Sequence, residues 1–235
     1  MGCSAGPSVA SSPVLYLDAG NTKSYPGSGT AWTDLSGIGN TGTLTNGPTY
    51  NAANGGSIVF DGADDYSTGN LGITNNSDFS VSFWLYYLSP YGGSNTDRGI
   101  ISTWDGSWNG FGIGTFTNGT IIRSWARNGA GGGMNWGQIS TLANGWHNLV
   151  LVYNYATRTQ SGYIDTGFSN SEVMGGTSIT HSDLQISRGG QTGSTQLNYY
   201  PYLNARFGNV NVFSRALSAA EIRTNFNAMR GRYGL

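Results

Sequence analysis

The clearest pattern along the chain is a strict alternation of side chains at 78–88, DFSVSFWLYYL. A period of two with many β-branched and aromatic residues is typical of a strand. A second run of this kind, GWHNLVLVYN, occupies 145–154. One side of the first strand carries Phe79, Val81, Phe83, Leu85 and Tyr87, and the other carries Ser80, Ser82, Trp84 and Tyr86. We expect Phe83 and Val150 to lie in a core between two sheets.

Shorter strands are predicted before, between and after these two, separated by turn sequences such as Asp61-Gly62. The predicted strand at 161–167 follows 145–154 closely, which suggests a hairpin. About ten to twelve short strands with turn chemistry between them indicate an all-β, two-sheet antiparallel sandwich. The further predicted strands are 14–18, 57–61, 99–103, 110–116, 120–126, 184–188 and 205–215.

One helix is predicted at the C-terminal end, over 218–231. Ser218 and Glu221 have the spacing of a capping box. Apolar residues at i, i+4 and i+7 form one face that can pack on the sandwich, namely Ile222, Phe226 and Met229. Gly231 is expected to end the helix, and Arg230 and Arg232 complement its dipole.

Composition favours a folded domain with a polar, weakly charged surface. Charged residues make up 10% of the 235 residues, against roughly 25% in an ordinary globular protein. Glycine occurs 38 times, and aromatic residues reach 13%, which argues against disorder. Residues 1–13 are small and polar and are predicted to form an extended N-terminal arm. Residues 14–235 are then one β-sandwich domain, long enough to bury a sizeable core.

Charge and hydropathy exclude several partners. The net charge is −1 and the 11 basic residues are scattered, so we expect no nucleic-acid binding. No apolar run approaches the roughly 20 residues that span a bilayer, so we expect no membrane insertion. Cys3 is the single cysteine, and the chain therefore has no intramolecular disulfide. The first residues also lack the apolar core of a signal peptide.

Five segments carry a resemblance when they are taken in order. They are SIVFDGADDY (57–66), DFSVSFWLYY (78–87), GWHNLVLVYN (145–154), SGYIDTG (161–167) and FGNVNVFSRALSAAEI (207–222). Together they resemble the laminin-G-like, concanavalin A-like jelly-roll domain, over residues 14–230. Residues 15–50 and 225–235 are similar to a narrower group, the stand-alone laminin-G-like structural proteins of tailed bacteriophages, including phages of cyanobacteria.

This resemblance implies a non-enzymatic virion structural or accessory protein, such as a capsid decoration or tail component. Its partners would be a capsid or tail protein, further copies of itself, and cell-surface glycans. It would be made in the host cytoplasm without a signal peptide and would lie on the virion surface. The alternatives are a soluble extracellular, lectin-like carbohydrate-binding module and a domain related to glycoside hydrolases.

The residues themselves argue against catalysis. Glucanases of the related sandwich family use Glu-x-Asp-x-x-Glu, whereas this chain has two glutamates, Glu172 and Glu221, in no such motif. Asp64 and Asp65 are adjacent and would point to opposite faces of a strand. His147, His181 and Cys3 show no spacing for nucleophilic catalysis or zinc. We therefore predict that the protein is not an enzyme.

Calcium is the cofactor that the sequence favours. It binds six to eight oxygen ligands, which loops at the rim of a sandwich can provide. The loop 34–40 presents Asp34, Ser36 and Asn40, and the loop 60–65 presents Asp61, Asp64 and Asp65. Members of the resembled fold often bind calcium at the rim. The alternative is that Asp and Asn stand here because they favour turns.

A tryptophan-rich stretch over 99–138 is the candidate glycan surface. Aromatic rings pack on the C–H faces of sugars, while amides, carboxylates and guanidinium groups bind the hydroxyls. Alternatively, the tryptophans fill the core or a subunit interface, where this residue is enriched. The predicted glycan-binding residues are Trp104, Asp105, Trp108, Asn109, Trp125, Arg127 and Trp136.

Overall fold

The computed structural model describes most of the chain and all of the predicted strands except position 120. For 116, 121, 125–128 and 137–140 it describes the backbone without the side chains. The predicted arm lies outside the described residues except for Pro13. The described ranges are 13–88, 98–103, 109–116, 121–128, 137–140, 142–173, 179, 181, 183–189 and 202–235.

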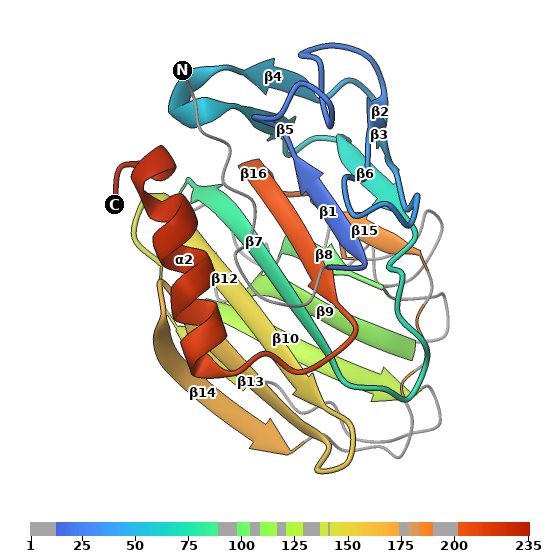
Figure 1. The fold of residues 1–235 in the computed structure, drawn as a ribbon, viewed down its shortest axis with the longest axis vertical. Helices are drawn as coiled ribbons and strands as arrows, with labels where there is room; N and C mark the ends of the chain where they lie inside the picture. Colours follow the sequence, from blue (N-terminus) through green and yellow to red (C-terminus); the bar gives the residue numbers. More distant parts are fainter. Residues whose placement is uncertain are drawn as a thin grey trace.

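The described residues form two eight-stranded antiparallel sheets that pack face to face (Figure 1). In spatial order, sheet A consists of β14 (Gly167–Val173), β13 (Thr159–Ile164), β12 (Gly145–Asn154), β7 (Phe79–Tyr87), β16 (Asn204–Phe213), β5 (Ser57–Asp61) and β4 (Thr49–Asn51), with β1 (Leu15–Asp18) also paired to β16. Sheet B consists of β11 (Gly137–Ser140), β10 (Ile121–Asn128), β9 (Asn109–Phe116), β8 (Arg98–Ser102), β15 (Leu184–Ile186), β6 (Tyr66–Gly69), β3 (Gly42–Thr45) and β2 (Ala31–Trp32). The predicted all-β, two-sheet jelly-roll sandwich is confirmed.

The core between the sheets is built on the alternation seen in β7. All five residues predicted on its apolar side, including Phe83, are buried in the main hydrophobic cluster. Leu149 of β12 lies opposite Phe83 and belongs to the same cluster. Phe111 and Ile113 of β9 reach this cluster from sheet B. The placement of Phe83 in the core is therefore confirmed.

Val150 lies on the other face of sheet A, and its predicted position between the sheets is wrong. It packs with Val152, Phe213, Leu217 and Ile222 beneath the C-terminal helix. Strand β12 is apolar on both faces because each face is covered, one by sheet B and one by the helix. A run such as Leu-Val-Leu-Val has no polar residue that shows which of the two alternating sets of side chains faces the core.

A bulge in β16 changes which residues face the core. Ala205 and Phe207 face inward, but after the register shift between Phe207 and Val210 the inward residues are Val210 and Val212. A Cβ atom at Gly208 would clash with the Tyr233 side chain, which the helix presses against this bulge. The extra residue in the bulged strand inverts the alternation beyond it.

The predicted strand at 161–167 is interrupted, and this prediction is corrected. Strand β13 ends at Ile164, and β14 begins at Gly167 after a two-residue turn. Asp165 and Thr166 in this turn both have positive φ, 48° and 74°, as tight hairpin turns with matching twist require. The hairpin partner of β13 on this side is therefore β14, which forms the edge of sheet A.

The predicted helix is present as α2 (Ala219–Tyr233), which crosses the outer face of sheet A (red in Figure 1). Ser218 and Glu221 form the expected capping box. The helix does not end at Gly231, as predicted, but continues until Gly234 adopts the left-handed C-cap conformation. Tyr233 can thereby stack on Trp84, with ring centroids 4.2 Å apart. None of the helices in the described residues is long and apolar enough to cross a membrane.

Arg232, in the last turn of α2, fastens the helix to β1 and to the turn before β5. Its guanidinium lies 2.7 Å from the carboxylate of Asp18, which is fully buried, and donates to the carbonyl oxygen of Gly56 at 3.0 Å. A Cβ at Gly20 or Gly55 would collide with the Arg232 side chain. Glycine at these positions therefore gives the guanidinium its path to Asp18.

Candidate functional site: an acidic turn and an arginine–tyrosine stack

The predicted glycan-binding residues are only partly within the described structure. Trp104, Asp105, Trp108 and Trp136 lie outside the described residues. Trp125 and Arg127 lie in β10, where the backbone pairs position 125 with Gly112 and position 127 with Gly110 of β9. Asn109 begins β9 and is half-buried. The β9–β10 hairpin thus brings three of the seven predicted positions onto neighbouring strands, and their role stays a prediction.

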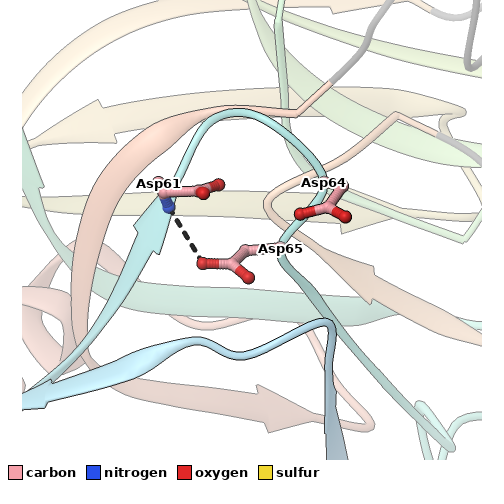
Figure 2. Close-up of side chains that lie close together, drawn as sticks. All are labelled: Asp61, Asp64 and Asp65. Atoms are coloured by element: carbon pink, nitrogen blue, oxygen red, sulfur yellow. Dashed lines mark hydrogen bonds between the residues drawn. The ribbon is translucent and has the colours of Figure 1, made fainter.

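The turn between β5 and β6 gathers three carboxylates, from Asp61, Asp64 and Asp65 (Figure 2). One carboxylate oxygen from each lies within 4.8 Å of the others. Asp61 and Asp64 are exposed, whereas Asp65 is only 4% exposed. The backbone N–H of Asp61 donates to Asp65 Oδ2 at 3.1 Å, and that of Ala63 donates to Asp61 Oδ1 at 2.8 Å. We name this group the acidic turn.

Burial and the neighbouring charges of Asp61 and Asp64 raise the pKa of Asp65. The expectation that Asp64 and Asp65 point apart is wrong, because both precede the first residue of β6 and follow a bend rather than a strand. Like charges this close disfavour full ionisation unless a cation compensates them. The acidic turn therefore has the donor chemistry of a hard-cation site, with carbonyl oxygens and water available to complete the shell.

The second predicted calcium loop is organised differently. Asp34 Oδ1 accepts from the backbone N–H groups of Tyr16 and Ser36, and Oδ2 accepts from Gly39 N–H, Asn40 N–H and the Ser36 hydroxyl, at 2.7–3.1 Å. Burial would raise the pKa of Asp34, but these hydrogen bonds outweigh it and lower the pKa. Two carboxylate oxygens offer about four acceptor sites. Asp34 and Asn40 do lie together, but protein donors already occupy the carboxylate that a cation would need.

An arginine–tyrosine stack lies on the outer face of sheet B, directly after the acidic turn along the chain. The core residues Leu44 and Ile186 pair with Ser67, so the alternate position, Tyr66, faces away from the core. The guanidinium carbon of Arg188 sits 3.4 Å from the centre of the Tyr66 ring. The rings of Tyr66 and Tyr202 are 6.2 Å apart.

Arg188 is itself almost completely buried, and its Nε donates to Gln185 Oε1 at 2.8 Å. Burial lowers the pKa of Arg188, against the opposing influence of Tyr66 and Tyr202. An arginine stays charged even so. The stack therefore combines a fixed positive charge with two half-buried aromatic rings, whose hydroxyl groups and apolar faces are typical of polar-ligand sites.

Both histidines are held by contacts within the fold. His147 Nδ1 lies 2.7 Å from Asp165 Oδ2 in the β13–β14 turn, and Nε2 lies 3.1 Å from the carbonyl oxygen of Ala143. The hydrogen bond to Asp165 raises the pKa of His147. His181 packs edge-on against Phe79, and burial lowers its pKa to about 4. His181 Nδ1 also lies 3.1 Å from the Thr103 hydroxyl, which accepts a hydrogen bond from the Phe111 backbone N–H at 3.2 Å.

Sequence reasoning missed three of these residues as site candidates, namely Tyr66, Tyr202 and Arg188. Asp65 was predicted as part of the calcium loop. Tyr66 and Arg188 are far apart in the sequence, and no local pattern pairs them. The signal that could have found Tyr66 is its place directly after three clustered acids, in the segment FDGADDY.

Comparisons with known proteins agree with the fold. A family described as the concanavalin A-like lectin/glucanases superfamily (Laminin_G_3) matches residues 60–223. This is well over half of the chain, and the chain belongs to this family. No curated protein matches the sequence.

Solved structures with a similar fold include botulinum neurotoxin domains. The receptor-binding domain of botulinum neurotoxin D superposes with a TM-score of 0.70 at 15% identity, over 92% of this chain and 52% of that one. The receptor-binding domain of type G gives 0.67 at 18% identity, over 92% and 51%. The chain thus spans about half the length of these structures. At such identity the likeness shows the fold alone.

Proposed function

We propose that the protein is a lectin-like carbohydrate-binding module without catalytic activity, and that sheet B carries the sugar site. The outer face of sheet A is closed by α2 and its two apolar clusters. The outer face of sheet B instead carries the arginine–tyrosine stack next to the acidic turn. This pairing of aromatic rings, guanidinium and carboxylates at one end of a sheet is the observation that carries the proposal.

The chemistry of these groups fits a sugar. The half-buried rings of Tyr66 and Tyr202 offer apolar surface for C–H faces, and the exposed carboxylates of Asp61 and Asp64 offer acceptors for hydroxyls. Arg188 and Gln185 are buried and bonded to each other, so Arg188 supports the Tyr66 ring instead of contacting the sugar. The family includes lectins by its own description, and the similar toxin structures are receptor-binding domains. The predicted Trp104–Trp136 surface would extend the same sheet through β9 and β10.

The glutamates support a role without hydrolysis. Arg215 and Ser218 bind the Glu221 carboxylate at the helix cap, and the hydrogen bond from Arg215 lowers its pKa to about 2. Glu172 lies on the edge strand β14, in sheet A. Neither glutamate is part of the acidic turn, so a glutamate pair for glycoside hydrolysis is not assembled.

Affinity electrophoresis through gels that contain different polysaccharides tests this proposal. We expect the full chain to be retarded by at least one polysaccharide and Tyr202→Ala to be retarded less. Tyr50→Ala, at an exposed tyrosine of β4 in sheet A, is the matched control and should behave like the parent. If no polysaccharide retards the parent, or if Tyr202→Ala and Tyr50→Ala behave alike, the proposed site is wrong.

We also propose that the acidic turn binds calcium and orders the start of β6. Asp61, Asp64 and Asp65 would be the ligands, with Asp34 left in its hydrogen-bonded loop. Added calcium should raise the Tm and a chelator should reverse the rise, following mass action with free ion concentration. Asp64→Asn should abolish the shift, whereas Asp183→Asn, at an exposed aspartate outside the turn, should keep it. A Tm that ignores both calcium and chelator would remove this proposal.

The virion role that the sequence suggested stays a prediction. The proteins matched above are toxin receptor-binding domains and do not support it. It is compatible with a sugar-binding surface, because a particle protein can contact cell-surface glycans. Co-sedimentation of the chain with virus particles would support the role. If the chain does not sediment with them, the extracellular carbohydrate-binding module is the remaining interpretation.

A further inference from the structure

A polar seam separates the two apolar clusters beneath α2. One cluster contains Trp84 and Met229, and the other contains Phe213. These three residues also line a small cavity between them, on the outer face of sheet A. Five polar residues complete the lining and form what we name the asparagine seam, namely Ser82, Asn148, Asn209, Asn211 and Asn225.

The seam follows from the bulge in β16. Without the register shift, Asn209 and Asn211 would continue the inward series of Ala205 and Phe207. The shift turns them to the outer face instead, where Asn211 lies opposite Ser82 of β7. Asn225 reaches the same cavity from α2, which lies on the outer face of sheet A in Figure 1.

Three of these amides are buried and carry polar atoms without a hydrogen-bond partner in the described part of the chain. Asn209, Asn211 and Asn225 are 1%, 5% and 9% exposed. In the described part of the chain, Asn209 Oδ1, Asn211 Oδ1 and both polar atoms of Asn225 have no hydrogen-bond partner. Buried polar atoms in folded proteins are almost always satisfied by protein or by ordered water. Unsatisfied atoms of three amides around a single cavity therefore point to a ligand within it.

We propose that the cavity binds an ordered water molecule that joins Asn209, Asn211 and Asn225 and fixes α2 in its position on sheet A. The cavity offers about 10 Å³ to the centre of a water molecule, which is about the space that one bound water needs. The water donates to the oxygens of Asn209 and Asn211 and accepts from the Asn225 amide nitrogen.

A metal cation fits the seam less well. A cation cannot accept a hydrogen bond from the Asn225 amide nitrogen, whereas water both donates and accepts. None of the described residues that line the cavity is a carboxylate, and hard divalent ions favour carboxylate ligands. Hydrogen bonds to the bound water are also directional, unlike the apolar contacts of the helix. Apolar clusters tolerate small shifts of a helix, but hydrogen bonds through one water hold Asn225 over β16.

A crystal structure at about 1.2 Å resolution or better, from crystals grown in rubidium chloride, tests the proposal on the unaltered chain. We expect a density peak in the cavity, roughly 2.7–3.2 Å from at least two of the three amides, without anomalous signal at the rubidium edge. A rubidium signal at the peak would show that a monovalent cation, and not water, occupies the cavity, and would overturn the proposal. A cavity without a peak, with the amides bonded to one another, would also overturn the proposal.

A pair of variants on one helix gives a second test. Asn225→Leu replaces the seam amide by an apolar side chain and leaves the amides of Asn209 and Asn211 without this partner. Asn227→Leu changes an exposed residue two positions away on the same helix. We expect Asn225→Leu to lower the Tm by about 4 °C or more and Asn227→Leu to leave it nearly unchanged. If Asn225→Leu is as stable as the parent, the cavity is dry and the proposal fails.

Discussion

The ion pair between Arg232 and Asp18 offers the sharpest prediction about stability. Asp18 is fully buried, and Arg232 is the one cation bonded to it in the described structure. Arg232→Met keeps much of the aliphatic stem but removes the charge. The Asp18 carboxylate then keeps the Tyr16 hydroxyl, at 3.1 Å, and the Gly20 N–H, at 2.9 Å, but loses its counter-ion.

Removing one partner of a buried ion pair typically costs about 3–5 kcal/mol. Because two hydrogen bonds to Asp18 survive, we expect a loss of about 3 kcal/mol for Arg232→Met, measured by urea denaturation. Arg230→Met, at an exposed arginine of the same helical turn, should change stability by less than about 0.5 kcal/mol.

A double-mutant cycle separates the ion pair from lost packing. Asp18→Asn removes the buried charge, so Arg232→Met should cost much less in that background than in the parent. If Arg232→Met costs under about 1 kcal/mol in the parent, or equally in both backgrounds, the carboxylate does not depend on Arg232 and the reasoning is refuted.

Three further predictions follow from the described contacts. Phe83→Ala should lose about 3–5 kcal/mol of stability in chemical denaturation, because a fully buried ring leaves a cavity between the sheets; a near-neutral result would contradict the core assignment. Ser218→Ala should lower stability by roughly 0.5–2 kcal/mol through loss of the N-cap, while Ser214→Ala, at an exposed serine before the helix, should not; equal effects would argue against the capping box. The folded-state pKa of His147 is raised, so its contribution to stability is present below its unfolded pKa and is lost as pH rises through the folded pKa. His147→Gln should therefore cost more stability at about pH 5.5 than at about pH 8.5, and an equal cost at both would show that the bond to Asp165 does not depend on protonation.

Local patterns predicted the elements well where one signal decided them. The strands at 57–61 and 145–154 have the predicted bounds because alternation and turn residues agree there. The helix start was equally local, since Ser218 and Glu221 form the cap within one turn. The end of the helix was missed because stacking of Tyr233 on Trp84, distant in sequence, favours one further turn beyond Gly231.

The sequence alone could not predict in the same way on which face of a sheet a side chain lies, or which distant segments come together. Val150 was placed on the wrong face because both faces of β12 are buried. The bulge that turns Asn209 and Asn211 outward depends on how Tyr233 packs against Gly208. The aspartates of the acidic turn were predicted as a calcium loop, but the close approach of Asp64 and Asp65 was not. The stack of Arg188 on Tyr66 arises because β6 and β15 are neighbours in sheet B, and sequence spacing does not encode that.

Isothermal titration of the full chain with an oligosaccharide from the most strongly retarding polysaccharide tests the central claim most directly. The account predicts saturable binding by the parent, weaker binding by Tyr202→Ala, and an oligosaccharide recovered at its original length after prolonged incubation with the protein. The absence of binding heat and of any other sign of association would contradict the sugar-binding module. Recovery of shortened oligosaccharide would contradict the absence of catalysis.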